Sequence, residues 1–340
     1  MGLSIDDSLD LVSATLNAVD KGKWTDLTGD LQEYYAMPRI LKKQQVRFQS
    51  GLKIEGRVMV RDGGQARVKK MYAIDDTDRV DLMEKMFIPW RLAETSWTID
   101  KTELSLNRSE NRIFELIKEQ RIGAFVSLAK LLEHMFWGKP ASAADDMTWW
   151  GIGMCIVKNS TEGFHGGDPA GFPSGYGELS SVDYPRFQNY SGSYVAISKA
   201  DLVKKMRTMY RKIQFRSPIN MPSNQRGSSN YGIFTNENVY SGYEALVEGQ
   251  NENMGDDIGG RAPKFKGNRV NWVPSLDSDA TDPVYFINWA SFYPVFLSGE
   301  YMVEGPPRKA PMQHTVIETF IDLTGNFRCT DRRSQGVLSK

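Results

Sequence analysis

The longest run of regular hydrophobic spacing predicts a long amphipathic helix over residues 108–137. Its apolar positions recur every three or four residues, as on one face of a helix: they are Phe114, Ile117, Ile122, Phe125, Leu128, Leu132 and Met135. Asn107 is a favourable N-cap, Glu110 completes a capping-box pattern, and Gly138 and Pro140 follow the last turn. About 30 residues at 1.5 Å each give a rod of roughly 45 Å.

Alternation of apolar and polar residues predicts a β-hairpin over residues 56–70. The turn would be Asp62-Gly63-Gly64, because glycine adopts the left-handed conformation that a three-residue loop requires. This register puts four apolar side chains on one face: Val60 pairs with Ala66, and Val58 with Val68. The other face is polar and basic, with Arg57, Met59, Arg61, Gln65, Arg67 and Lys69. An isolated hairpin is marginally stable in water, so we expect it to lie on another surface.

The rest of the chain predicts a mixture of short elements. Residues 1–30 contain a short apolar stripe at helical spacing, and residues 86–106 look extended. From about residue 148 Gly, Asn, Ser and aromatic residues dominate. Two further helices are expected there, one from Ser198 to before Pro218 and one from Asn236 to Gly249. Strands are expected in residues 283–297 and 314–327, so the predicted fold class is α+β.

Charge is balanced over the whole chain but not along it. Lys plus Arg equals Asp plus Glu, at 42 each, which argues against a dedicated nucleic-acid-binding protein. Residues 1–30 hold six aspartates and two lysines, whereas residues 38–70 hold ten basic and two acidic residues. These opposite charges indicate complementary contacts between or within copies of the chain. For the hairpin's basic face, a contact between subunits is favoured over phosphate binding, because no aromatic residues for base stacking accompany it.

Candidate chemistry is sparse. Glu162, His165 and Asp168 lie together in a glycine-rich loop, but a hydrolytic metal site usually needs a second histidine. A tight turn whose side chains cap backbone groups is the favoured interpretation. Cys155 with His165 as nucleophile and base has no third orienting group, and no phosphate-binding glycine motif is present. We therefore predict no catalytic residue, no metal and no cofactor.

The sequence also bears on the compartment. Neither Cys155 nor Cys329 lies in a metal-binding or redox motif, so both are expected to be buried free thiols. Residues 1–30 lack the basic and apolar regions of a signal peptide. No apolar stretch is long enough for a transmembrane helix. The expectation is a protein made and folded in a cytoplasm.

Several blocks in the second half of the chain resemble, in order, the major capsid proteins of tailed bacteriophages. They are residues 149–159 (WWGIGMCIVKN), 163–171 (GFHGGDPAG), 183–190 (DYPRFQNY), 271–277 (NWVPSLD), 283–285 (PVY), 292–297 (FYPVFL) and 326–333 (NFRCTDRR). The first 147 residues match that family by layout more than by motif.

The resemblance implies the Hong Kong ninety-seven-type capsid fold. It would make residues 1–44 an N-terminal arm and residues 45–100 an extended β-hairpin loop. Residues 101–147, completed by residues 300–340, would form a peripheral domain with the long spine helix. Residues 148–299 would form the axial domain. The apolar and basic faces of the hairpin would then contact neighbouring subunits, through Arg57, Val58, Arg61, Arg67, Val68 and Lys69.

The resemblance also implies the function. Family members form hexamers and pentamers that close an icosahedral shell around double-stranded DNA, so the expected location is the virion, after assembly in the bacterial cytoplasm. Expected partners are further copies of the chain, portal, scaffold and decoration proteins, and packaged DNA bound non-specifically; no membrane is expected. Some members crosslink subunits through a Lys and an Asn, a pair that the sequence does not identify here.

Two other functions remain open, a tail or baseplate component and a metal-dependent hydrolase centred on His165.

Overall fold

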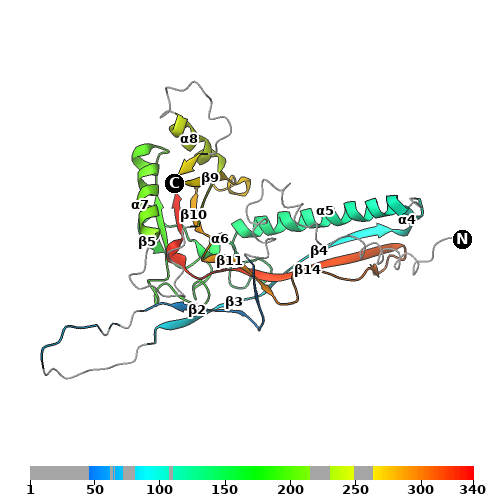
Figure 1. Ribbon diagram of the computed structural model, residues 1–340, viewed down its shortest axis with the longest axis horizontal. Helices are drawn as coiled ribbons and strands as arrows, with labels where there is room; N and C mark the ends of the chain where they lie inside the picture. Colours follow the sequence, from blue (N-terminus) through cyan, green and yellow to red (C-terminus); the bar gives the residue numbers. More distant parts are fainter. Residues whose placement is uncertain are drawn as a thin grey trace. The chain divides into compact units, whose positions relative to one another are not determined.

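The computed structural model describes residues 46–61, 64, 66–71, 81–106, 110–214, 230–248 and 263–340 (Figure 1). The chain divides into two compact units, each built from three separate segments. Unit 1 contains the described part of Met1–Ser50, together with Trp90–Phe136 and Pro294–Asn326. Unit 2 contains Gly51–Pro89, Trp137–Tyr293 and Phe327–Lys340. The predicted N-terminal arm, the helical stripe in residues 1–30 and the cap at Asn107 lie outside the described residues.

Unit 1 is a helix packed along a sheet. The sheet has the order β1-β11-β14-β12, with β4 and β13 also paired to β14. Its strands are β1 (Arg47–Gln49), β4 (Arg91–Asp100), β11 (Phe292–Leu297), β12 (Val303–Glu304), β13 (Arg308–Lys309) and β14 (Val316–Cys329). β4 and β14 pair antiparallel along the whole length of β4. Residues 86–106 were expected to be extended throughout, but Lys101–Leu106 form the short helix α4.

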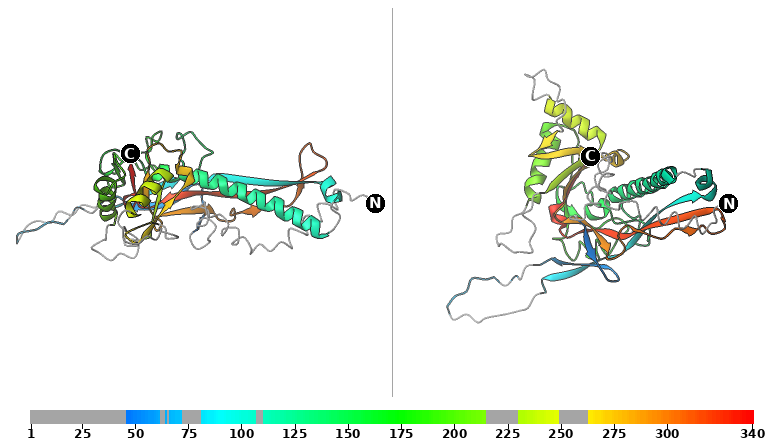
Figure 2. Two further views of the ribbon diagram at one scale, coloured as in Figure 1. Left: turned by 90° about the horizontal axis from the view of Figure 1, so that it is seen from above. Right: turned by 45° about the vertical axis from the view of Figure 1, so that its right-hand side comes forward.

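The predicted long helix is confirmed as α5 (Glu110–Trp137), which runs along β4 and β14 (Figures 1 and 2). It ends immediately before Gly138, as the sequence indicates. Its apolar stripe packs on alternate residues of both strands, in a buried cluster of Trp97, Ile99, Leu104, Ile117, Ala124, Ile317 and Ile321. Arg121 of α5, also buried, donates to Glu304 of β12 at 2.6 Å. A buried ion pair of this kind fixes the helix in one register, because either charge alone would be costly.

Unit 2 contains a seven-stranded mixed sheet with the order β5-β6-β15-β10-β7-β9-β8. The strands are β5 (Gly163–Gly166), β6 (Asn189–Ser193), β7 (Tyr231–Thr235), β8 (Lys264–Phe265), β9 (Asn268–Trp272), β10 (Val284–Asn288) and β15 (Gly336–Ser339). The last strand in the sequence, β15, lies inside the sheet, parallel to β6 and antiparallel to β10. The predicted strand over residues 283–297 is therefore two strands, β10 and β11.

Two helices cover one face of this sheet. A π-helical turn η2 (Lys199–Val203) leads into α7 (Lys204–Ile213), and α8 is Glu237–Glu248. The predicted starts are confirmed, since the side chains of Ser198 and Asn236 accept hydrogen bonds from the amides of Asp201 and Val239. Both helices pack on inward-facing sheet residues in one buried cluster. Shorter helical turns are α6 (Ile152–Cys155), η3 (Pro274–Leu276) and η4 (Arg332–Ser334).

Aromatic residues fill the rest of unit 2. Trp149 is fully buried against Phe327, and Trp150 is buried against Tyr176. The Tyr285–Ile287 run of β10 is also buried. These groups are core residues, one of the two roles that the sequence suggested for them. No helix among the described residues has the length and apolar character needed to span a bilayer.

Candidate functional site

The residues predicted to contact a neighbour lie in or next to a two-stranded sheet of unit 2. It pairs β2 (Ile54–Met59) with β3 (Met83–Ile88), so that Arg57 faces Lys85 and Val58 faces Glu84. The amide of Val60 donates to Leu82 at 3.2 Å. The predicted pairing of Val58 with Val68 and of Val60 with Ala66 is therefore wrong. Within the predicted turn, Asp62 and Gly63 lie outside the described residues, and Gly64 has a φ of 60°.

The partner strand differs from the prediction because of its apolar side chains. Met86 and Ile88 of β3 are fully buried beside Ile54, whereas Val68 is fully exposed. Pairing with the distant segment therefore removes more apolar surface from water than pairing with residues 66–70 would. Local alternation alone does not distinguish the two partners.

The buried face of this sheet packs on its own unit. The amide of Phe87 donates to the carbonyl oxygen of Gly177 at 3.1 Å, and Lys53 pairs with Glu178 at 2.8 Å. On the same side Arg328 donates to the carbonyl oxygen of Glu55 at 2.8 Å. Val58 is only 9% exposed in the single chain. A docking role on a second copy thus stays a prediction for Val68 and for the basic side chains, while Val58 already has neighbours within its own chain.

The exposed face of β2 and β3 is organised in cross-strand rows. Glu55 lies opposite Phe87, Arg57 opposite Lys85, and Met59 opposite Met83. Lys85 reaches Glu55 at 4.0 Å, but no ion pair of Arg57 is found among the described residues. The two methionines are about half exposed, at 49% and 55%. Two like charges directly opposite one another repel, so this face is suited to an anionic partner.

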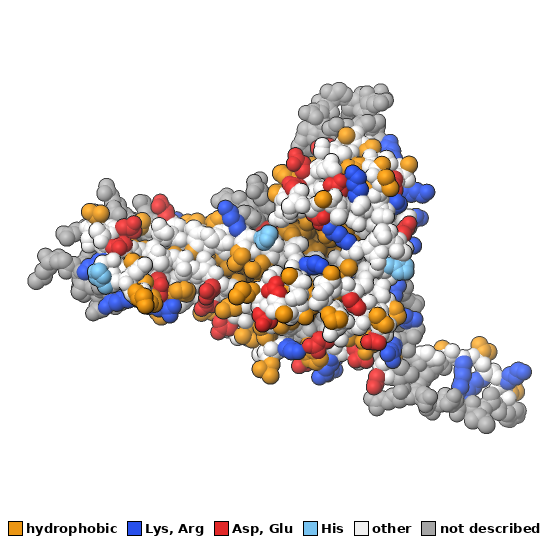
Figure 3. Space-filling view, turned by 180° about the vertical axis from the view of Figure 1, so that it is seen from behind, with side chains coloured by type: hydrophobic (Ala, Val, Ile, Leu, Met, Phe, Trp, Pro, Cys, Tyr) orange, Lys and Arg blue, Asp and Glu red, His pale blue; other side chains and the backbone are white. Residues whose placement is uncertain are grey.

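The remaining predicted contact residues follow β2. Arg61 lies over the ring of Tyr184, 5.6 Å from its centroid, and burial together with the carboxylate of Glu84 raises the pKa of that tyrosine. Arg67, Val68 and Lys69 are exposed. Figure 3 shows Lys and Arg side chains (blue) on the described part of the segment between β2 and β3. The basic character predicted from sequence is therefore present at the surface of unit 2.

The candidate acid–base loop is occupied by structural hydrogen bonds. Asp168 accepts from the amide of Ser181 at 2.8 Å, and Glu162 accepts from the hydroxyl of Tyr190 at 3.0 Å. His165 is exposed on β5, whereas Cys155 is fully buried. In the described part of the chain, no three His, Cys, Asp or Glu side chains are grouped so as to hold a metal ion. The geometry matches the capping interpretation of this loop.

Sequence comparisons do not assign the chain: no protein-family profile matches it, and no curated protein does. Comparison with solved structures shows the fold of the chain. The capsid asymmetric unit of cyanophage A-1(L) superposes with a TM-score of 0.61 at 14% identity, covering 91% of this chain and 94% of that one. The capsid of an empty GTA particle gives 0.56 at 10% identity over 87% of each chain. Mycobacterium phage Bobi gives 0.50 at 10% identity over 93% and 97%.

This chain has the phage capsid fold. The fold predicted from the sequence blocks is thereby confirmed over nearly the whole chain.

In this capsid fold, the block at residues 326–333 has a role that sequence reasoning missed. Arg332 is fully buried, and its guanidinium donates to four backbone carbonyls: those of Cys155, Gly166, Gly167 and Phe187, at 2.8–3.1 Å.

The surroundings of Arg332 explain how it is accommodated. Its guanidinium lies 5.9 Å and 5.7 Å from the ring centroids of Tyr176 and Phe187. Burial lowers its pKa, yet the carbonyl dipoles offset the loss of water around the cation. Cys155 and Cys329 are buried free thiols, as expected, and burial raises the pKa of the Cys329 thiol. Nothing in the local sequence distinguishes Arg332 from the exposed arginines, because its partners come from loops far away in sequence.

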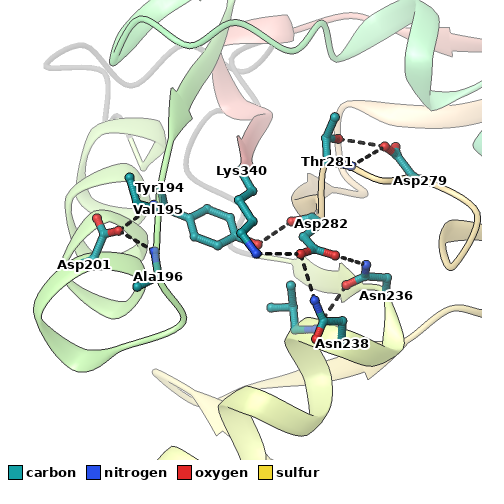
Figure 4. Close-up of polar contacts among 11 residues, drawn as sticks. Tyr194, Val195, Ala196, Asp201, Asn236, Asn238, Asp279, Thr281, Asp282 and Lys340 are labelled. Carbon is teal, nitrogen blue, oxygen red and sulfur yellow. Dashed lines mark hydrogen bonds and ion pairs between the residues drawn. The ribbon is translucent and has the colours of Figure 1, made fainter.

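A second polar centre joins the start of β10 to α8 (Figure 4). The buried carboxylate of Asp282, a residue with a φ of 43°, accepts from Asn236 at 2.6 Å and Asn238 at 2.8 Å. Lys340 lies 3.6 Å from the same carboxylate, and the hydroxyl of Tyr194 donates to the Asp282 carbonyl at 2.6 Å. Such a satisfied network positions elements. It fixes the N-terminus of α8 against the sheet of this capsid fold.

Proposed function

We propose that this protein is the major capsid protein of a tailed bacteriophage. Its copies would form hexamers and pentamers, and these would close an icosahedral shell around double-stranded DNA. The observation that carries the proposal is the match to the cyanophage capsid subunit over 91% of this chain and 94% of that one. A chain that reproduces the whole length of a shell subunit, rather than one domain of it, is suited to the same role.

The proposal gives each part of the chain a place in the subunit. Residues 1–44 would be the N-terminal arm, and β2 with β3 would form the base of the extended loop in residues 45–100. Unit 1 with its spine helix α5 supports a peripheral domain, and the sheet of unit 2 supports an axial domain over residues 148–299. We assign residues 327–340 to the axial domain as well, rather than to the peripheral domain, because β15 pairs with β6 and β10.

Partners and location follow from the proposed role. The main partner would be the chain itself, with a portal, a scaffold protein and decoration proteins joining the shell. Packaged DNA would be enclosed without sequence specificity, and the zero net charge of the chain argues against a dedicated DNA-binding role. The protein would be located in the virion after assembly in the bacterial cytoplasm. A structural, non-enzymatic role is supported by the acid–base loop, where Asp168 and Glu162 serve as hydrogen-bond acceptors.

The other two functions have less support. A tail or baseplate component would not explain a match to capsid subunits over the whole chain. A hydrolase centred on His165 would need a second ligand or a base beside it, and the side chains of Glu162 and Asp168 bind other partners.

Electron microscopy of the purified protein tests the proposal. We expect negatively stained preparations to show closed shells or ring-shaped capsomers, and light scattering to show a mass far above 38.5 kDa. A well-folded monomer at every concentration, with and without a co-expressed scaffold, would contradict it. Elemental analysis tests the hydrolase alternative in the same sample: stoichiometric zinc or iron that disappears in His165→Ala would support an enzyme.

A further inference from the structure

Unit 2 contains two cysteines that are far apart in the sequence and close together in the fold. Cys155 is the last residue of α6 and Cys329 is the last residue of β14, and both belong to unit 2 and are fully buried. About half of the chain lies between them, and the chain has no other cysteine. An internal disulfide of this protein can therefore join only this pair.

Arg332 and Tyr176 hold the backbone around the two thiols. The guanidinium of Arg332 donates to the carbonyl oxygen of Cys155 at 2.8 Å. The amide of Cys329 donates to the hydroxyl of Tyr176, also at 2.8 Å. Because the guanidinium lies 5.9 Å from the ring centroid of Tyr176, one compact cluster contains both cysteines. Within this cluster the Cys155 thiol is a hydrogen-bonding neighbour of the Cys329 thiol.

The two sulfur atoms need only a short movement to form a bond. A disulfide brings its sulfurs to about 2.05 Å, and thiols that are hydrogen-bonding neighbours already lie side by side. A shared metal ion does not account for the pairing, because no group of three possible metal ligands occurs in the described part of the chain. The pair is therefore placed for a covalent bond between its own two members.

The same surroundings slow the oxidation of the pair. The reactive form of cysteine is the thiolate. Burial raises the pKa of the Cys329 thiol, so its thiolate is scarce at neutral pH, although the positive charge of Arg332 favours it. Full burial also keeps bulky reagents away from both sulfurs. The folded protein should therefore react slowly, and only with small oxidants.

We propose that Cys155 and Cys329 form a disulfide within one chain when the folded protein meets a small peroxide. One sulfur takes an oxygen atom from hydrogen peroxide and becomes a sulfenic acid, which releases the first water. The second thiol then displaces the hydroxyl group as the second water, and the sulfur–sulfur bond forms. The two thiols lose two electrons, and these electrons reduce the peroxide.

The disulfide would stabilise the folded subunit. It closes a loop of about half of the chain, and a bond that closes a long loop restricts the unfolded chain strongly. This bond can form whether or not the chain builds a shell. In the proposed shell it would appear after the particle leaves the cytoplasm, where thiols are kept reduced.

Counting free thiols before and after oxidation tests the bond. The native chain is treated with hydrogen peroxide, denatured and alkylated with N-ethylmaleimide, and mass spectrometry counts the labels. We expect both cysteines to be labelled before treatment, neither after it, and both again after reduction with dithiothreitol. The last step distinguishes a disulfide from sulfinic and sulfonic acids, which are not reversed. A non-reducing gel should show single chains, because the bond lies within one chain.

Thermal unfolding measures what the bond does to the subunit. The oxidised sample should unfold at a midpoint about 5 °C or more above that of the same sample after reduction with dithiothreitol. Methionine sulfoxides remain in both samples, so their effect cancels. Cys155→Ala and Cys329→Ala are the matched controls, and in either variant the reduction step should leave the midpoint unchanged.

Thiols that stay free in the native fold, although peroxide oxidises them in urea, would overturn the inference. So would irreversible oxidation of both sulfurs or a disulfide between chains. An oxidised sample no more stable than its reduced form would overturn the stabilising role. All these results come from the native chain, so they hold even if an alanine variant fails to fold. A chain that forms the internal bond but never assembles would contradict only the proposed function.

Discussion

At the scale of single residues, the buried Arg332 connects several segments of unit 2. Its guanidinium satisfies carbonyls on α6, on the segment after β5 and on the loop before β6. One side chain thereby substitutes for the regular hydrogen bonds that these irregular segments lack. A buried cation of this kind is stable only while every donor is used.

Replacing Arg332 by methionine keeps its bulk and removes its donors. We expect Arg332→Met to lower the free energy of unfolding of the unassembled subunit by at least about 3 kcal/mol, because buried carbonyls are left unsatisfied. The matched control is Arg333→Met: that half-buried arginine lies 4.2 Å from the ring centroid of Phe164, and its loss should cost clearly less because its guanidinium is not fully buried. Urea unfolding measures the free energy of unfolding of both variants. Equal losses in the two variants would contradict the role of Arg332 in holding the backbone carbonyls.

Asp201 gives a pH-dependent prediction. Hydrogen bonds from Lys205 and from the amides of Ala196 and Val195 lower the pKa of this carboxyl to about 2. Figure 4 shows the two amide contacts. A folded-state pKa below the unfolded value stabilises the protein above that value, and the gain disappears as the pH falls from about 4 toward 2. Asp201→Asn should therefore be less stable than the native chain at pH 7 and should converge with it in acid. Unfolding midpoints between pH 7 and about pH 2 check this, with Glu119→Gln as the control for an exposed carboxylate.

At the scale of elements, Gly177 determines how closely β3 approaches its own unit. It has a φ of 67°, and a Cβ there would overlap the side chain of Met86. We expect Gly177→Ala to cost about 2–5 kcal/mol, from left-handed strain plus overpacking. Gly267→Ala is the matched control, because Gly267 has a φ of 87° and open space around it, so that only the strain of about 1–2 kcal/mol applies.

Hydrogen exchange shows where the Gly177 substitution acts. The amide of Phe87, which donates to Gly177, should lose protection in Gly177→Ala and keep it in Gly267→Ala. Unchanged protection in both variants would mean that β3 is held by other contacts.

Replacing Val58 or Val68 by Asp is expected to affect the stability of the subunit differently. The hairpin predicted from sequence lies outside the main core, so that an Asp at either position should leave the fold intact. In the structure Val58 is buried opposite Glu84, and Val58→Asp should cost about 2 kcal/mol or more. Val68→Asp should change stability by less than about 0.5 kcal/mol, because Val68 is fully exposed. Thermal unfolding of both unassembled variants measures the difference. Equal melting temperatures would contradict the observed register of β2 with β3.

These elements also show what sequence can predict. The helix α5 and the N-caps at Ser198 and Asn236 depend on neighbours in sequence, and all three were predictable. The partner strand of β2 was not predictable. β3 (Met83–Ile88) pairs with β2 because Met86 and Ile88 become buried, and that burial exists only in the folded unit. Arg332 escaped prediction for the same reason, because its partners are distant in sequence. The exposed basic side chains were predictable because they depend only on composition and strand alternation.

At the scale of the whole molecule, the basic side of the loop should control assembly. A variant with Glu at Arg57, Arg61, Arg67 and Lys69 should remain folded and soluble but form no shells, because attraction between copies becomes repulsion. Higher salt should shift the native assembly products before it unfolds any subunit, since exposed charges are screened within about 8–10 Å. Sizing and electron microscopy measure both effects.

The competing role of these residues is DNA binding, and a preparation free of nucleic acid separates the two. If the Glu variant forms empty shells with normal yield and only DNA retention declines, the basic side chains bind DNA and the subunit contact is wrong. Loss of empty shells supports the contact between copies.

The position of β15 in its sheet has a consequence for protein synthesis. Residues 336–339 pair with β6 on one side and β10 on the other, so until they leave the ribosome the sheet consists of two halves with open edges. Exposed edges of interior strands invite pairing with other chains. We therefore expect a chain that lacks residues 336–339 to be unable to form the folded subunit that the proposed shell needs.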